Sequence, residues 1–78
     1  MLKLKLMNKC DGKIVFNYYP EGKSDFGTVS INEKTGEIDI MNVAQNDEFG
    51  RYKIHAINRI KEYFENKKFV TEDIVAWY

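Results

Sequence analysis

The chain has 78 residues, and its 12 Lys and Arg side chains balance 12 Asp and Glu, so the formal net charge at pH 7 is zero. This length predicts one domain, residues 1–78, with a single hydrophobic core and modest stability. The balanced charge argues against a nucleic-acid or membrane partner that is held mainly by charge. One cysteine and the lack of a long apolar run predict a cytoplasmic protein.

Residues 2–19 predict a β-hairpin. Leucine alternates with lysine over residues 2–6, and apolar side chains recur at every second position over residues 13–19. Asp11-Gly12 stands between these stretches and is typical of a tight hairpin turn, because glycine tolerates the positive φ that such a turn requires. The more apolar face of each strand is expected to point inward and carries Leu2, Leu4, Leu6, Ile14, Phe16 and Tyr18.

A second hairpin is predicted further along the chain. Residues 20–25 are polar and begin with a proline, so they should form an exposed loop. Alternation returns over residues 26–31, and the next five residues are typical of a loop built on a type I turn, with Gly36 in the left-handed conformation. The last strand would fade near Val43. Its isoleucines should pair with two residues of the preceding strand: Ile38 and Ile40 with Val29 and Ile31.

Residues 46–67 are the only stretch that predicts a long amphipathic helix. Asn46 is expected to cap its N-terminus, and the two acidic residues that follow place negative charge at the positive end of the helix dipole. Gly50 would be explained by a close approach to a strand, whereas Ile54 points away from the buried side. The apolar face is expected to consist of Phe49, Tyr52, Ala56, Ile57, Ile60, Tyr63 and Phe64.

The apolar tail, residues 74–78, leaves two structures open. It could add a fifth strand beside the first one, antiparallel to it, or form an irregular segment beneath the helix. The sequence therefore predicts an α+β fold: an antiparallel β-meander of four strands, with a fifth as the open alternative, and one amphipathic helix packed on one face.

Residues with catalytic or metal-binding chemistry are few. His55 is the only histidine and is expected on the wet side of the helix, without the orienting partner that a general base needs. Cys10 precedes the first turn and lacks a histidine neighbour in sequence that could activate a thiol. No metal-ligand spacing and no phosphate-binding glycine motif is present. The sequence thus predicts no enzyme activity, no cofactor and no metal.

Surfaces remain as the candidates for function. We expect a small protein-binding or homodimerising module, because several apolar and aromatic side chains exceed what a lone domain requires. The candidate interface residues are Tyr19, Met41, Val43, Ile54, Trp77 and Tyr78. Trp77 and Tyr78 could instead complete the core of the monomer. The bias toward Lys, Ile and Asn is typical of an AT-rich bacterial or phage genome.

Nucleic-acid binding is the alternative, and we expect it less than protein binding. The sheet face opposite the helix would carry Lys3 and Lys5 beside the aromatic side chain of Tyr19. RNA-binding sheets of similar shape present several aromatic residues within a basic surround, and this face supplies only Tyr19 on a chain of zero net charge.

Overall fold

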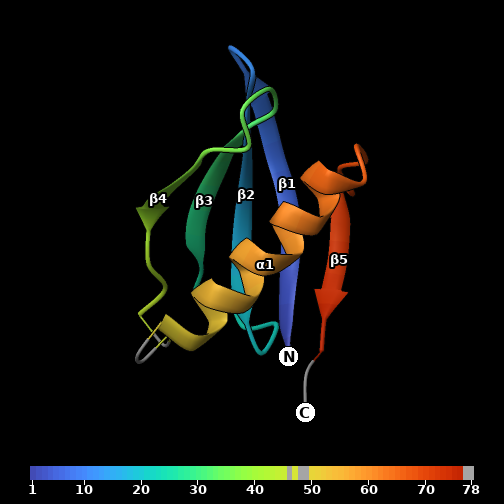
Figure 1. The fold of residues 1–78 in the computed structure, drawn as a ribbon. Helices are drawn as coiled ribbons and strands as arrows, with labels where there is room; N and C mark the ends of the chain where they lie inside the picture. The colour runs from blue at the N-terminus through green and yellow to red at the C-terminus, as the bar shows by residue number, and fades with distance from the viewer. Residues whose placement is uncertain (46, 48–49, 77–78) are drawn as a thin grey trace.

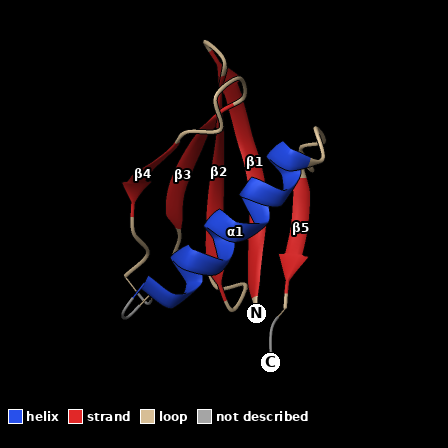
Figure 2. Ribbon diagram, viewed as in Figure 1, coloured by secondary structure: helices blue, strands red, loops and turns tan. Residues whose placement is uncertain are grey.

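The computed structural model describes residues 1–45, 47 and 50–76, which form one antiparallel sheet with a single helix on one of its faces (Figure 2). Within these residues the sheet has five strands in the spatial order β4-β3-β2-β1-β5 (Figure 1). The elements are β1 (Leu2–Cys10), β2 (Lys13–Pro20), β3 (Gly27–Asn32), β4 (Ile38–Asn42), α1 (Arg51–Glu65) and β5 (Glu72–Val75). The predicted α+β fold is confirmed, and the fifth strand forms antiparallel to β1. It begins at the polar Glu72 and includes Ile74 and Val75 of the apolar tail.

Two tight turns fix the hairpins where the sequence predicts them. In the first turn, Asp11 and Gly12 have φ values of 52° and 76°, the positive pair that a type I′ turn needs to match the strand twist. In the second, Gly36 has φ 78°, and its N–H donates to the Asn32 carbonyl at 2.8 Å. The Asn32 N–H in turn donates to the Glu37 carbonyl at 2.8 Å. This arrangement is a G1 β-bulge, whose first residue is a left-handed glycine.

Two strands contain an extra residue that changes which way their side chains point. The register of β1 against β2 shifts after Leu6, where Met7 has no partner, and that of β4 against β3 shifts at Met41. An unpaired residue breaks the alternation between the two faces of a sheet. Beyond Met7, Lys9 therefore points to the helix side, and Cys10 points to the opposite side, which we call the open face.

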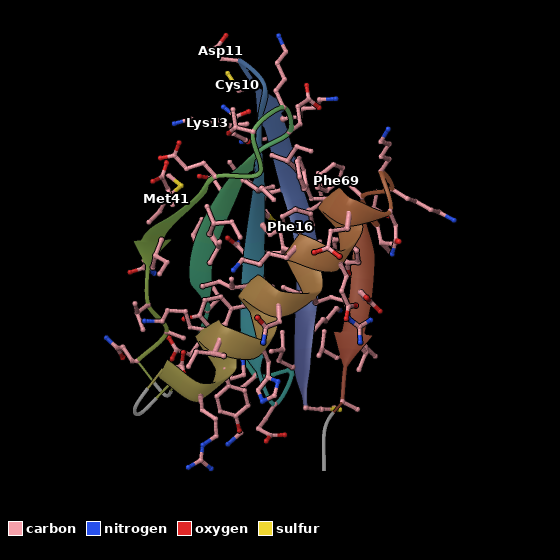
Figure 3. The ribbon with its side chains drawn as sticks, in the orientation of Figure 1. Cys10, Asp11, Lys13, Phe16, Met41 and Phe69 are labelled. Atoms are coloured by element: carbon pink, nitrogen blue, oxygen red, sulfur yellow. The ribbon has the colours of Figure 1, made fainter. Side chains whose placement is uncertain are left out.

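The core lies between the sheet and α1. Phe16 occupies its centre, with its ring centroid 5.9 Å from that of Tyr63 and 6.4 Å from that of Phe69 (Figure 3). The inward face predicted for β1 and β2 is confirmed, although Leu6 is only half-buried. The buried apolar residues are Leu2, Leu4, Ile14, Phe16, Tyr18, Val29, Ile31, Ala44, Ala56, Ile60, Tyr63 and Val75.

The helix begins later than predicted, at Arg51 rather than Asn46. Asn46, Glu48 and Phe49, the last of which was predicted on the apolar face of the helix, lie outside the described residues. Gly50 precedes the helix with φ 66°, a left-handed conformation that glycine adopts without strain. The expected close approach of a strand to Gly50 is therefore wrong, because the nearest atoms to a Cβ built there belong to the flexible Lys53 side chain of the helix itself.

A buried hydrogen-bond cluster caps the helix and ties it to the sheet. The Asp47 carboxylate accepts the backbone N–H of Tyr52 at 2.8 Å and that of Lys53 at 2.9 Å. It also accepts the Tyr18 hydroxyl at 3.1 Å, while the Ala44 N–H donates to that hydroxyl at 3.1 Å. Asp47 thus supplies the acceptors that the first turn of a helix needs, and Tyr18 anchors them to the middle of the sheet.

The helix also ends earlier than predicted, at Glu65 rather than at Lys67. Lys67 has φ 56°, and its N–H donates to the Phe64 carbonyl at 3.1 Å. The Lys68 N–H reaches back to the Tyr63 carbonyl at 3.0 Å. These two bonds are those of a Schellman motif, with a lysine where glycine is the usual residue.

Candidate binding surfaces

The side chains expected to form a protein interface belong to two surfaces rather than one. Met41 and Val43 lie in and just beyond β4, and the exposed Ile54 lies in the first half of α1, which begins on the β4 side of the sheet (Figure 1). Tyr19 lies in β2 and points to the open face. Trp77 and Tyr78 are outside the described residues. The two candidate surfaces are the β4 edge, residues 38–43, and the open face.

Among the residues that the structure describes, the backbone groups on the outer side of β4 make no hydrogen bond. The Asn32 N–H bond to the Glu37 carbonyl marks a hydrogen-bonded pair, and such pairs alternate along an antiparallel ladder. Ile38 and Ile40 therefore occupy the non-hydrogen-bonded positions opposite β3, and their N–H and C=O groups point away from the sheet. An edge strand in this state is a template for a further strand.

The side chains of the β4 edge do little to block such pairing. Ile40, Met41 and Val43 are 46%, 63% and 44% exposed. Lysine and proline, which protect many edge strands, are absent from residues 38–43, where Asp39 is the only charge and Met41 forms the only bulge. Ile40 shares the helix side with its partner Val29, whereas Met41 lines a hollow on the open face. Apolar groups are thus available on both sides of the strand.

The open face is polar at its centre. The Thr28 hydroxyl donates to the Asn17 side-chain carbonyl at 2.9 Å, and the Asn17 amide donates to the Tyr19 hydroxyl at 3.4 Å. Asn17 and Ser30 are buried although the one helix in the described residues lies on the other face of the sheet. This part of the face has the polar character expected of a sheet with one side toward water.

A basic and aromatic hollow of about 360 Å³ lies at one end of the open face. The register pairs Lys3 with Tyr19, and Lys5 lies two residues further along β1. The loop after β2 adds the remaining lining residues: Gly22, Lys23 and Ser24. Beside the hollow, the Tyr19 ring packs on exposed Phe26 with 5.6 Å between ring centroids and an interplanar angle of 45°.

A second hollow, of about 470 Å³, lies at the opposite end of β2 and includes Cys10, Lys13, Val15 and Met41 among its lining residues (Figure 3). The Cys10 sulfur lies 3.8 Å from a carboxylate oxygen of Asp11. A catalytic thiol needs a histidine or another cation beside it. The group that contacts the Cys10 sulfur is instead an anion, and the cation paired across the strands, Lys13, is engaged by Asp39 at 3.6 Å. This arrangement gives no support to a nucleophilic role.

The only histidine and the only cysteine of the chain lie on different elements, α1 and β1. His55 is half-buried in the first half of α1, which lies toward the far end of the sheet from the hairpin tip that holds Cys10 (Figures 1 and 3). Among residues 1–45, 47 and 50–76, no three His, Cys, Asp or Glu side chains are grouped so that they could hold a metal ion. The one helix in these residues is too short and too polar to cross a membrane.

No family model matches the chain. No curated protein and no solved structure matches it either.

Sequence reasoning missed two side chains of the open face, Phe26 and Lys23. Phe26 lies two residues before Thr28, so the alternation of the strand already placed it on the same side as Thr28 and away from the core. Lys23 carried no such signal, because its position depends on the turn at Glu21 and Gly22, where φ is 54° and 69°. The turn brings residues 22–24 back over the end of β2.

Proposed function

We propose that this chain is a small protein-binding module, without catalytic activity, that recognises its partner through the β4 edge. The observation that carries the proposal is a strand with outward-pointing backbone groups at Ile38 and Ile40 and exposed apolar side chains on both sides. Strand addition at such an edge gains hydrogen bonds from the backbone and contact area from alternate side chains. The single exposed Cys10 thiol suits a reducing compartment such as the cytoplasm.

The partner that we propose is a second copy of the chain. Two β4 strands can pair antiparallel about a two-fold axis, which is the commonest symmetry of protein dimers. An axis at Asp39 would place two carboxylates opposite each other, which is unfavourable. An axis at Ile40 instead makes Ile40 a hydrogen-bonded pair with its own copy and places Asp39 opposite Met41 of the partner subunit.

The size of the interface sets a further condition. A stable dimer buries roughly 800 Å² on each partner, whereas the whole chain exposes 5148 Å². A strand as short as β4 supplies such an area only together with neighbouring side chains. Val43 is exposed just beyond β4, and Ile54 is exposed in the first half of α1, the helix that begins on the β4 side of the sheet (Figure 1). We include them in the proposed interface.

Analytical ultracentrifugation tests the proposal. We expect the wild-type chain to be a dimer at about 100 μM and its melting temperature to rise with protein concentration. Ile40→Pro should be monomeric, because proline removes the outward-pointing N–H without affecting the ladder to β3. Ile40→Val is the matched control and should remain dimeric. A wild-type chain that is still monomeric at about 1 mM, where even a weak dimer would be populated, would overturn the proposal.

Disulfide trapping tests the register. In a Cys10→Ser background, Ile40→Cys should form a covalent dimer on oxidation, because hydrogen-bonded antiparallel pairs have Cα atoms about 5.5 Å apart, within disulfide reach. Ile54→Cys in the same background should form it far more slowly, since that helix position is not on the axis. Equal rates for the two variants would contradict the proposed axis.

A further inference from the structure

The hollow lined by Lys3, Lys5, Tyr19 and Lys23 concentrates positive charge on a chain that has none overall. Lys3 pairs with Glu72 at 3.0 Å, and both of these side chains are exposed to water. Among the described residues, neither Lys5 nor Lys23 has a salt-bridge partner within 4.0 Å. Three ammonium groups therefore line the hollow, and two nearby carboxylates act on them: Glu72, which pairs with Lys3 and also attracts Lys5, and Glu21, which attracts Lys23. The remaining excess of positive charge favours an anion.

The aromatic pair beside these lysines supplies a flat apolar surface. Phe26 is exposed, and it packs against the half-buried ring of Tyr19, which itself lines the hollow. A ring at this place is not needed by the core, because Phe26 and Tyr19 lie on the face that α1 does not cover. Exposed aromatic rings beside cationic groups are the combination on which unstacked bases bind, with the phosphates held by the cations.

The face also continues beyond the hollow. Along β2, the side chains of Lys13, Val15 and Tyr19 point to the same side, and the second hollow surrounds Lys13 and Val15. Lys13 and Tyr19 are separated by about 20 Å at the rise of a strand. Lys13 is paired with Asp39 at 3.6 Å, and the Asp11 and Asp39 carboxylates line the second hollow. An extended strand of nucleotides along β2 would therefore have its phosphates held by lysines at the first hollow only.

We propose that the open face binds nucleoside phosphates, with the phosphate near Lys5 and Lys23 and the base on the rings of Tyr19 and Phe26. The length of the face favours units of single-stranded DNA or RNA over a free nucleotide. A duplex would not fit this chemistry, because its bases are stacked on each other and cannot reach the rings. The site requires no second copy of the chain, so it is independent of the dimer proposed at β4.

Fluorescence anisotropy with labelled oligothymidylate tests the site. Three lysines that each neutralise one phosphate give a slope of log K against log salt of about −2, which corresponds to an affinity loss of about twentyfold between 50 and 200 mM NaCl. Lys5→Glu should abolish binding. Its matched control, Lys61→Glu, makes the same charge change at an exposed position on the helix and should bind as the wild type does.

The aromatic contribution is tested by Phe26→Leu, which keeps an apolar side chain but removes the ring. It should weaken binding about fivefold or more at constant salt, since base stacking contributes about 1–3 kcal/mol, and should leave the salt slope unchanged. Circular dichroism verifies that each variant is folded. Competition with thymidine monophosphate distinguishes the two sources of the ligand. Weak competition indicates that the ligand is single-stranded nucleic acid, and competition as strong as that of the oligonucleotide indicates a free nucleotide. Either result supports the site itself.

Three results would overturn the proposal. The first is that wild-type protein at about 1 mM does not bind in low salt, where non-specific sites are normally filled. The second is that duplex and single-stranded DNA bind equally well. The third is that Lys5→Glu and Lys61→Glu change the affinity equally. None of these results bears on the dimer, because the Ile40 variants change a different surface.

Discussion

Replacing Tyr18 by phenylalanine removes one oxygen atom and tests the cluster that joins the sheet to the helix. The Tyr18 hydroxyl is the acceptor for the buried Ala44 N–H and a donor to the Asp47 carboxylate, both at 3.1 Å. The substitution leaves the Ala44 N–H without that acceptor, which costs about 1–3 kcal/mol, and removes a hydrogen bond to a charged group, which contributes about 1.5–3 kcal/mol. Asp47 keeps its two bonds to the helix N-terminus. We therefore expect the free energy of unfolding to fall by an amount near the lower end of the sum of these two costs, about 2–3 kcal/mol.

Urea denaturation at pH 7, followed by far-ultraviolet circular dichroism, measures this loss. With a slope of about 1 kcal/mol/M for a domain of this size, the midpoint should fall by about 2–3 M. Tyr19→Phe is the control, because the Tyr19 hydroxyl accepts only a 3.4 Å bond from the Asn17 amide on the open face; its midpoint should change little. If Tyr18→Phe unfolds within about 0.5 kcal/mol of the wild type, a difference typical of neutral surface changes, the cluster does not stabilise the fold as we argue.

Three further predictions concern backbone conformation and pH. Lys67→Gly should stabilise the domain by about 0.5–1 kcal/mol, because glycine adopts the left-handed conformation at the helix end without strain; a lower urea midpoint would contradict the Schellman geometry. Gly36→Val should destabilise it by about 2–3 kcal/mol, since its φ is positive and a Cβ there would lie 2.9 Å from the Phe64 ring; an unchanged midpoint would refute the turn assignment. Burial raises the pKa of Tyr18 from 10.0 to about 12 and also raises that of Tyr63. Their contribution to the free energy of unfolding is therefore complete below about pH 10 and lost as the pH rises toward 12 and beyond, so the alkaline part of a pH series of urea midpoints should fall less steeply in Tyr18→Phe.

The sheet could be predicted from the sequence because its signals are local. Alternation with period two, Asp11-Gly12 and Gly36 each fix a strand or a turn through a few neighbouring residues, and the pairing of Ile38 with Ile31 and of Ile40 with Val29 followed from them. The fifth strand could only be left open, because its pairing depends on where the helix delivers the chain. That is a long-range property.

The ends of the helix were misplaced for a different reason. Asn46 and Asp47 both have the side chains of capping residues, and sequence alone favoured the first. In the structure the acceptor is Asp47, and Gly50 turns the chain between it and the helix. At the other end, Lys67 is compatible with a continuing helix, and its positive φ is imposed by the chain turning toward β5.

Some residues of the candidate sites could likewise be predicted from local patterns, and others could not. Met41, Val43 and Ile54 were predicted to be exposed because each breaks a local pattern or lies on a polar face, and the structure agrees. Tyr19 and Met41 line different hollows of the open face, whereas Ile54 lies on the helix, so their grouping as one interface stays a prediction. Lys23 became part of a site only through the turn that follows β2, which a strand pattern does not describe.

The position of β5 at the side of β1 determines the order in which the chain can fold. The β1–β2, β2–β3 and β3–β4 pairings connect neighbouring segments, whereas β5 pairs Val75 with Leu2 across almost the whole chain. Closing that loop costs the most chain entropy, so the meander should assemble first and β5 should dock last. Substitutions in β5 are then expected to raise the unfolding rate in stopped-flow experiments without slowing refolding. Until β5 docks, the outer backbone of Leu2 and Leu4 has no strand beside it, and this intermediate is the species most exposed to aggregation.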